Sequence, residues 1–331
     1  MNEPVCRVKK VVFGQGTPKI CVPLIALDKI ELEEQAKMLK MVPCDVVEWR
    51  ADYYPFLTSR EQVQDAFRIL RENLQDRLIL FTFRTKAEGG MRSVTVDEYM
   101  YLNRLVLLYG RPDLLDVELS AGEKVISVLL EKAHRKNIKV ILSFHDFHRT
   151  PPVVDMVSAL RKMQDLGADM CKLAVMPLSR TDVLALLQAT SDMYERYATR
   201  PLITMSMGKL GAISRVCGEV FGSCMTFGCM DRPSAPGQID ALNLSMMLQI
   251  IDRDCIGFTF RGAGAFQRLL QEANTSLDDL EERAAVRTSR EAIFQQTQAE
   301  TEEKPEMDPE EKPEIASDAT SDIVPEEGDL S

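Results

Sequence analysis

The sequence predicts an α/β fold of the (β/α)8, or TIM, barrel type, and two observations support this prediction. Eight apolar runs of five to eight residues alternate with eight stretches of helical periodicity, as in βαβ units with a parallel sheet. These units occupy about 235 residues, which fits a closed barrel in number and in length. An open doubly wound sheet often carries a GxGxxG turn after its first strand, and this chain has no such turn there.

Each predicted strand is followed by one predicted helix. The strands are largely continuous apolar runs, as burial on both faces of a parallel sheet requires. They are expected at 19–24, 45–52, 78–84, 114–119, 139–146, 170–176, 201–207 and 224–230. The helices are expected near 31–41, 59–74, 95–109, 121–136, 152–166, 180–197, 211–221 and 238–251.

Additional segments flank the eight units within and beyond the barrel domain, which we assign to residues 1–252. Two short extended pieces within 6–18 flank a glycine turn, which predicts a small β-hairpin that closes the bottom of the barrel. Residues 253–299 are expected to form a helical extension. From 300 to 331 Pro, Glu, Ser and Asp dominate and periodic apolar residues vanish, which predicts a disordered acidic tail.

Charge and cysteine usage exclude several classes of function. The formal net charge of −11 belongs to residues 300–331, which hold thirteen acidic residues and two lysines, so nothing indicates a nucleic-acid surface. No apolar run approaches twenty residues, so we expect no membrane span. Residues 1–4 lack the basic start of a secretory signal, so we expect none. The eight scattered cysteines form no CxxC pair, which indicates reduced packing residues in a cytoplasmic protein without a metal site.

Lys172 interrupts the apolar run 170–176, the sixth predicted strand. Desolvation lowers the pKa of an amine, and a neutral amine is a nucleophile that can form a Schiff base with a ketone. The alternative is a lysine at the end of a strand whose ammonium group reaches solvent. The run itself leaves both interpretations open.

Further polar residues lie at the carboxyl ends of the predicted strands, where barrels of this type place their active sites. In chain order they are Glu48, Arg50, Arg84, Glu88, Asp116, Glu118, His145, Lys172, Arg215 and the loop 231–238. Structural explanations exist for several of them: an ion pair between Glu48 and Arg50, a core histidine at 145, or scaffolding carboxylates. The convergence favours a functional site, because buried charge is costly unless it is paired or used.

This set of residues suits imine chemistry. Lys172 would attack a ketone, and His145 on the neighbouring strand would move protons, because an imidazole pKa of about 6.5 suits both acid and base roles. Glu88 would orient the imidazole, and Arg215 would bind a substrate carboxylate through its fork of donors. The imine itself polarises the substrate, so no metal or cofactor is needed. The remaining charged residues would bind hydroxyl groups or position one another: Glu48, Arg50 and Arg84.

The order and spacing of several motifs over residues 6–252 resemble the type I 3-dehydroquinate dehydratases of the shikimate pathway. The motifs are Glu48-Trp49-Arg50-Ala51-Asp52, Glu88-Gly89-Gly90, Asp116-Val117-Glu118-Leu119, Ser143-Phe144-His145-Asp146-Phe147, Lys172-Leu173-Ala174, Met205-Ser206-Met207-Gly208, Ser214-Arg215 and Ser234-Ala235-Pro236-Gly237-Gln238. The resemblance implies a hydro-lyase without cofactor or metal, usually a homodimer.

The resemblance also implies roles for individual residues. Lys172 would form the Schiff base with the C3 ketone of 3-dehydroquinate. His145, partnered by Glu88, would take the C2 proton and assist syn loss of the C1 hydroxyl as water, which gives 3-dehydroshikimate. The loop 231–238 would be a lid. The implied substrate contacts are Glu48, Arg50, Arg84, Arg215 on the carboxylate, Ser234 and Gln238.

The chain departs from the family pattern in two places. Many members carry a serine late in the first strand, where this chain has Pro23, so one hydroxyl contact with substrate would be absent. Residues 253–331 are not needed by the single-domain form. Two alternatives therefore stay open at this point: another Schiff-base-forming (β/α)8 aldolase, or a barrel to which the tail adds a binding role.

Overall fold

A computed structural model describes residues 4–55, 57–231 and 233–251 of the chain. Its central strands are β3 Lys19–Leu24, β4 Val46–Arg50, β5 Leu78–Thr82, β6 Leu114–Glu118, β7 Lys139–Asp146, β8 Met170–Val175, β9 Leu202–Ser206 and β10 Met225–Cys229. The helices are α1 Lys29–Met38, α2 Arg60–Asn73, α3 Val96–Tyr109, α4 Glu123–His134, α5 Val153–Asp165, α6 Arg180–Arg196, α7 Gly208–Cys217 and α8 Ala241–Ile251. The predicted extension (253–299) and acidic tail (300–331) lie outside the described residues.

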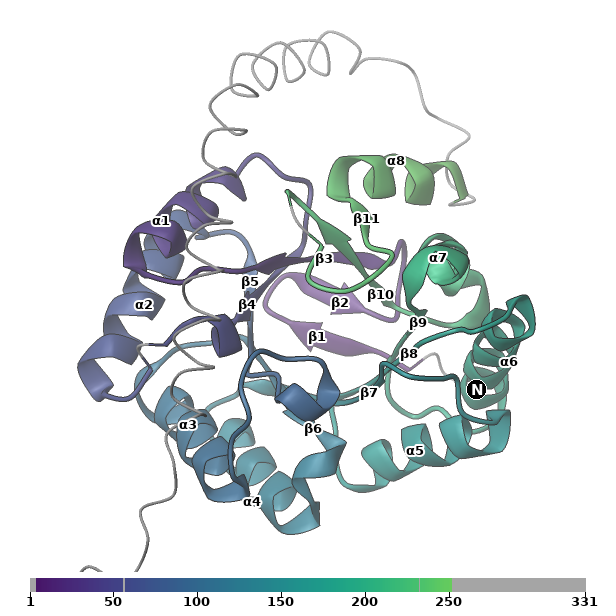
Figure 1. The fold of residues 1–331 in the computed structure, drawn as a ribbon, viewed down its shortest axis with the longest axis horizontal. Coiled ribbons are helices and arrows are strands. Elements are labelled where there is room, and N and C mark those ends of the chain that lie inside the picture. Colours follow the sequence, from purple (N-terminus) through teal and green to yellow (C-terminus); the bar gives the residue numbers. More distant parts are fainter. Residues whose placement is uncertain (1–3, 56, 232, 252–331) are drawn as a thin grey trace, which may run out of the picture. The chain divides into compact units, whose positions relative to one another are not determined.

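The eight central strands form a closed parallel barrel with the helices around it (Figure 1). The strands β3 to β9 lie side by side in sequence order, and β10 pairs with β3. Each strand is parallel to its neighbours. Closure comes from a parallel bridge between Leu202 and Ser223, where the amide of Cys224 donates to the carbonyl of Leu202 at 2.8 Å. The predicted (β/α)8 barrel is confirmed.

The predicted strands agree with the observed ones within a few residues, and the differences are instructive. The strands β4 and β6 are shorter than expected because the chain turns directly into a short 3-10 helix after each of them. Three such turns follow β4, β5 and β6 closely: η1 Ala51–Tyr53, η2 Lys86–Glu88 and η3 Leu119–Ala121. A two-residue strand that was not predicted, β11 Ile239–Asp240, pairs parallel with β10. These turns place polar residues over the mouth of the barrel.

The amino-terminal half of the barrel interior is apolar. Side chains from successive strands form one packed cluster there: Cys21, Val46, Leu78, Leu80, Leu114, Ile141, Met170, Ile203 and Met225. The hairpin of β1 Cys6–Val8 and β2 Val11–Phe13 adds the buried side chains Cys6, Val8 and Phe13 to the same cluster. The hairpin therefore closes the bottom of the barrel, as predicted.

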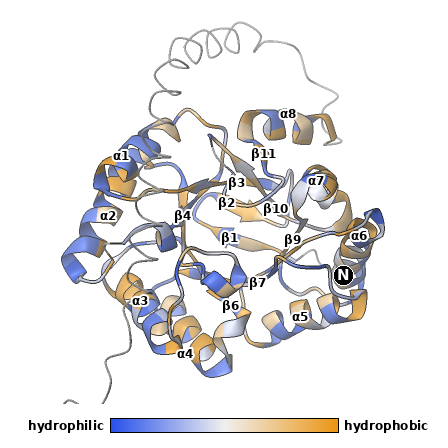
Figure 2. Ribbon diagram, in the orientation of Figure 1, coloured by the Kyte–Doolittle hydropathy of each residue, from blue (hydrophilic) through white to orange (hydrophobic). Residues whose placement is uncertain are grey.

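The outward-facing side of the sheet packs against amphipathic helices. Figure 2 shows both hydrophilic and hydrophobic residues on the helices around the barrel. Trp49 is fully buried between sheet and helices, with edge-to-face contacts to Tyr54, Phe67 and Phe81 at centroid distances of 5.5 to 5.7 Å. Such contacts stabilise the shell by about 0.5–1.5 kcal/mol per pair beyond burial. Within the described part of the chain, no helix is long and apolar enough to cross a membrane.

Candidate active site

A cavity opens at the carboxyl ends of the barrel strands. All nine site residues predicted from the sequence line it: Glu48, Arg50, Arg84, Glu88, His145, Lys172, Arg215, Ser234 and Gln238. The rest of its wall is mostly apolar and comes from Gly89, Phe147, Ala174, Met205, Met207, Phe227 and Ala235. The barrel topology thus gathers residues that lie up to 190 positions apart in the sequence.

The amine of Lys172 is buried in this cavity, with 5% of the side chain exposed. Its Nζ lies 3.6 Å from Oε1 of Glu48 and 3.6 Å from Oδ2 of Asp116. It also lies 4.2 Å from the ring centroid of Phe227. The alternative of a solvent-exposed amine is therefore wrong. The amine is therefore surrounded by two carboxylates and the face of an aromatic ring.

His145 lies on β7, one strand away from Lys172, and is held by Glu88. Its Nδ1 lies 2.9 Å from Oε2 of Glu88, and its backbone amide donates to the same oxygen at 3.1 Å. Burial lowers the pKa of His145 well below its ordinary value, and the nearby Arg84 and Lys172 lower it further. The imidazole is thus neutral, and donation from Nδ1 leaves Nε2 as the proton-accepting nitrogen.

Glu88 is itself unusual among the acidic groups. Burial raises its pKa to about 7; Glu118 adds to the shift, while Arg84 and a hydrogen bond from Ser120 oppose it. The 3-10 turn η2 that carries Glu88 ends at Gly89, whose φ of 83° is left-handed. A Cβ at Gly89 would lie 2.3 Å from the ring of Phe147, so glycine is required there for two reasons.

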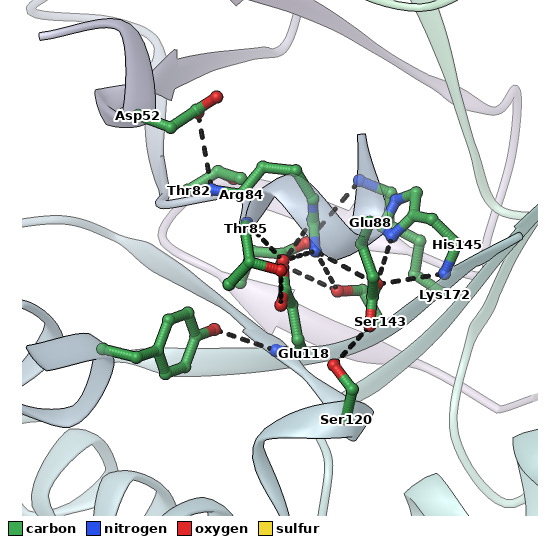
Figure 3. Close-up of polar contacts among 12 residues, drawn as sticks. Asp52, Thr82, Arg84, Thr85, Glu88, Glu118, Ser120, Ser143, His145 and Lys172 are labelled. Atoms are coloured by element: carbon green, nitrogen blue, oxygen red, sulfur yellow. Dashed lines mark hydrogen bonds and ion pairs between the residues drawn. The ribbon is translucent and has the colours of Figure 1, made fainter. Parts of the chain in front are cut away.

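Arg84 is the centre of a buried charge network below the cavity mouth (Figure 3). Its Nη2 donates to Asp116 at 2.6 Å, and its Nη1 donates to Glu118 at 2.9 Å and to Ser143 at 3.1 Å. Oε2 of Glu88 lies 3.6 Å from Nη1. Burial would lower the pKa of Arg84, but these carboxylates outweigh it and raise the pKa well above its ordinary value. Both terminal nitrogens of this guanidinium are therefore bonded to groups of the protein itself.

Arg50 does not form the ion pair with Glu48 that the sequence suggests as one explanation. It pairs with Asp52 instead. Its Nε and Nη2 each donate to the carboxylate of Asp52 at 2.8 Å, because η1 turns the chain back beneath the guanidinium. Burial would lower the pKa of Arg50, but Asp52 raises it above its ordinary value. Glu48 instead accepts a hydrogen bond from Thr82 at 2.9 Å and faces Lys172.

Arg215 on α7 contrasts with both of these arginines. It is 2% exposed, and its polar contacts are neutral: the sulfur of Met205 at 3.3 Å and the carbonyls of Phe227 at 3.5 Å and Pro236 at 3.1 Å. Its Nε has no partner, and among the described residues no carboxylate lies within ion-pair distance of it. Burial lowers its pKa to about 10. Within the described part of the chain, Arg215 is therefore a buried cation of the cavity without an anionic partner.

The loop after β10 covers the cavity near Arg215. The backbone amide of Ser234 donates to Oε1 of Gln238 at 2.7 Å, and Nε2 of Gln238 donates to the hydroxyl of Ser234 at 3.1 Å. The amide of Gly208 donates to the carbonyl of Pro236 at 3.0 Å, which fastens the loop to the start of α7. On β3, the strand next to β10, Pro23 is buried in register with Glu48, so no hydroxyl stands at that position.

The sequence does not define the role of every member of the site. It offers Asp116 and Glu118 as either scaffold or chemistry, and the structure places both carboxylates within ion-pair distance of Arg84. Ser143 precedes the histidine by two residues, so the strand period could have placed it on the same face. Ser120, which donates to Oε1 of Glu88 at 2.5 Å, gave no sequence signal because it follows the end of its strand.

The fold and the site together define a barrel enzyme with a buried lysine, a histidine–carboxylate pair and a buried guanidinium that lacks an anion. Such a set suits a carbonyl substrate that carries a negative charge. Among the described residues, no group of three or more histidines, cysteines or carboxylates is arranged to hold a metal ion.

Comparison with known proteins names the family. The model of the type I 3-dehydroquinase family matches residues 20–254. The 3-dehydroquinate dehydratase of Clostridioides difficile (strain 630) is 45% identical over 247 residues, which cover 75% of this chain and 97% of the relative. The 3-dehydroquinate dehydratase of Bacillus licheniformis is 46% identical over 248 residues, which cover 75% and 98%.

A solved structure agrees with these relatives. The crystal structure of type I 3-dehydroquinate dehydratase from Clostridium difficile with covalently modified comenic acid has a TM-score of 0.73 and 44% identity, and the match covers 76% of this chain and 99% of that one. The chain belongs to the type I 3-dehydroquinase family. It is accordingly an enzyme of the hydro-lyase class.

Proposed function

We propose that the chain converts 3-dehydroquinate to 3-dehydroshikimate through a Schiff base between Lys172 and the C3 ketone. The observation that carries this proposal is that the buried amine of Lys172 shares one cavity with the His145–Glu88 pair and with Arg215. The same cavity thus offers a nucleophile, a proton carrier and an anion-binding group. Membership of the type I 3-dehydroquinase family supports the choice of substrate and the place in the shikimate pathway.

The reaction begins with attack of the Lys172 amine on the ketone; the carbinolamine that forms takes up one proton from solvent, relayed by His145, and loses water to give a cationic imine. The imine acidifies the adjacent C2–H bond, and Nε2 of His145 removes that proton. The imidazolium formed is stabilised by the Glu88 carboxylate at Nδ1. His145 then donates its proton to the C1 hydroxyl, which leaves as water on the same face. General acid–base catalysis of this kind contributes about 10²–10⁴-fold.

The substrate's carboxylate and hydroxyl groups have partners in the same cavity. Arg215 would bind the carboxylate, because its guanidinium is buried without an anion of its own. The loop from 233 to 238 would close over the ring and exclude water, which strengthens each electrostatic contact. The remaining polar residues that line the cavity would contact hydroxyl groups: Glu48, Arg50, Arg84, Ser234 and Gln238.

Trapping with borohydride tests the proposal. Incubation with 3-dehydroquinate followed by borohydride should add the ligand mass to the peptide that holds Lys172. The matched variant Lys172→Met should gain no mass and should lose activity by at least about 10³-fold, because no other group supplies the imine. An unmodified Lys172 together with no ultraviolet signal from a conjugated enone would overturn the proposal. A covalently modified ligand in the related Clostridium difficile structure supports the choice of a covalent test.

Competition distinguishes the dehydratase from a Schiff-base aldolase on the same fold. Sugar or keto-acid aldolase substrates should neither form a trapped adduct nor compete with 3-dehydroquinate. A trapped adduct with such a substrate and none with 3-dehydroquinate would favour the aldolase.

Three organisational features are proposed with the function. We propose that residues 1–252 form the catalytic domain, that the enzyme is a homodimer and that it works in the cytoplasm. The family match over residues 20–254 supports the first of these. Deletion of residues 297–331 should leave activity and oligomeric state unchanged, as measured by enzyme assay and sedimentation. A change in either quantity would assign the tail a binding role.

A further inference from the structure

We propose, on the basis of the function proposed above, that Ser120 is a positioning residue for the reaction: its hydroxyl fixes the Glu88 carboxylate that orients His145. Three side chains then act in series, Ser120 to Glu88 to His145, and only the histidine moves protons of the substrate. Figure 3 shows the three residues with their connecting interactions.

The geometry divides the two oxygens of Glu88 between two tasks. Oε2 accepts from Nδ1 of His145 at 2.9 Å and from the backbone amide of the same residue at 3.1 Å. Oε1 accepts from the hydroxyl of Ser120 at 2.5 Å. Among the described residues Ser120 provides the hydrogen bond to Oε1, and Arg84 lies nearer to Oε2, at 3.6 Å. Without Ser120 the carboxylate would be held at one oxygen and could rotate away from His145.

The position of Ser120 is set by the fold. Ser120 lies in η3, which begins directly after β6 and ends before Gly122, a residue with a left-handed φ of 87°. The preceding Glu118 is anchored at the end of β6 by Arg84 and by the amide and hydroxyl of Thr85. This anchored turn directs the Ser120 hydroxyl towards Glu88, although Ser120 itself reaches the surface.

Protonation of Glu88 gives this contact a measurable consequence. Burial holds the pKa of Glu88 at about 7, and the Ser120 hydrogen bond works against that rise by stabilising the carboxylate. Loss of the hydroxyl should therefore raise the pKa of Glu88 further. Glu88 must be ionised to stabilise the imidazolium through the hydrogen bond from Nδ1. The acid limb of the plot of activity against pH should therefore move to higher pH. A hydroxyl that only fills surface space would not move that limb.

The test compares Ser120→Ala, Ser120→Thr and a matched control, Ser191→Ala. The control removes a serine–glutamate hydrogen bond of 3.3 Å to Glu195, which lies on α6 and outside the cavity. In Ser120→Ala we expect kcat to fall roughly 10- to 100-fold, as for one hydrogen bond to a charged group, with KM within about twofold. The acid limb should move upward by a measurable fraction of a pH unit. Ser120→Thr should restore both quantities, and Ser191→Ala should change neither.

An acid limb at its wild-type position in Ser120→Ala overturns the inference, whether or not kcat falls. If the alanine variant does not fold, Ser120→Cys replaces it, because cysteine is similar in size and is a weaker donor. The acid limb should then move to higher pH in Ser120→Cys. Borohydride trapping separates this inference from the proposed function. If the wild-type enzyme forms no adduct at Lys172, the proposed function fails; if it forms one and the limb stays in place, only the role of Ser120 fails.

Discussion

Arg84 and Arg215 line the same cavity, and their surroundings differ completely. Both guanidinium groups are almost fully buried, at 3% and 2% exposure. Arg84 contacts carboxylates on Asp116 and Glu118 and lies near a third, on Glu88, whereas the contacts of Arg215 are carbonyls and a thioether. As a result the pKa of Arg84 is raised well above its ordinary value, and that of Arg215 is lowered to about 10.

This difference separates a group that serves the protein from one that is reserved for a ligand. A buried charge without a partner is costly, so its persistence needs a compensating use. The charge of Arg84 is compensated within the fold by carboxylates, and the same contacts hold Glu88 and His145 in place. The charge of Arg215 is not compensated until an anionic ligand enters the cavity. Four experiments test how far the contrast holds.

Replacement of Arg84 should have the largest effect on stability. Arg84→Met leaves the carboxylates of Asp116, Glu118 and Glu88 buried without their common counter-charge. We expect the free energy of unfolding to fall by about 3–5 kcal/mol, as for removal of one partner from a buried ion pair. Urea denaturation followed by circular dichroism measures this change. A loss below about 1 kcal/mol would show that the cluster is not coupled as described.

Replacement of Arg215 should instead affect the substrate. Arg215→Met removes an unpaired buried charge, so the free energy of unfolding should stay within about 1 kcal/mol of the wild-type value or rise. The specificity constant kcat/KM should fall roughly 30- to 1000-fold, mainly through a higher KM. This corresponds to a loss of about 2–4 kcal/mol of transition-state stabilisation. Arg215→Lys, which keeps the charge but not the fork, should be intermediate. A stability loss as large as that of Arg84→Met would remove the distinction.

Ligand binding should stabilise only proteins that retain Arg215. A cyclic carboxylate such as the product 3-dehydroshikimate, at 100 times its Kd, should stabilise the wild-type protein by about 2.7 kcal/mol. Arg215→Met should show almost no stabilisation at the same concentration. The melting temperature with and without ligand provides the measurement, and an uncharged cyclic ketone serves as the control. Equal stabilisation of both proteins would place the carboxylate elsewhere.

Lowering the pH should affect Glu88, which lies next to Arg84, and should leave Arg215 charged. This effect should be the smallest of the four. The pKa of Glu88 is raised to about 7, so the carboxylate that orients His145 is lost as pH falls through that value. Activity should therefore decline by up to about tenfold per pH unit below 7, which corresponds to about 1.4 kcal/mol. In Glu88→Gln this limb should be absent at a lower overall rate. Binding of a carboxylate ligand to Arg215 should vary less over the same range.

The alternation of apolar runs and helical stretches was sufficient to predict the barrel, because each strand is buried on both faces and each connection has helical periodicity. The candidate site followed from polar residues at strand ends, such as His145 and Lys172, since parallel strands bring their carboxyl ends to one rim. All nine predicted residues line one cavity.

The pairing of these residues could not be predicted in the same way. Arg50 and Glu48 share a face of a strand, yet the strand ends at Arg50 and η1 presents Asp52 to the guanidinium instead. Ser120 reaches Glu88 across two turns whose shapes depend on glycines and on tertiary contacts. At these two positions the partner is decided by the geometry of a short turn, about which the strand and helix periods carry no information.

Closure of the barrel has a consequence for how the chain acquires its structure. β3 pairs on one side with β4, close in sequence, and on the other with β10, about 200 residues later. At synthesis rates of roughly 5–20 residues per second, β3 waits on the order of 10–40 s for its second neighbour. During that time one edge of the growing sheet is open, and such long-range pairing is slow. We expect pairing of β10 to bring Phe227 and the covering loop over Lys172, so that the cavity is complete only when the barrel is closed.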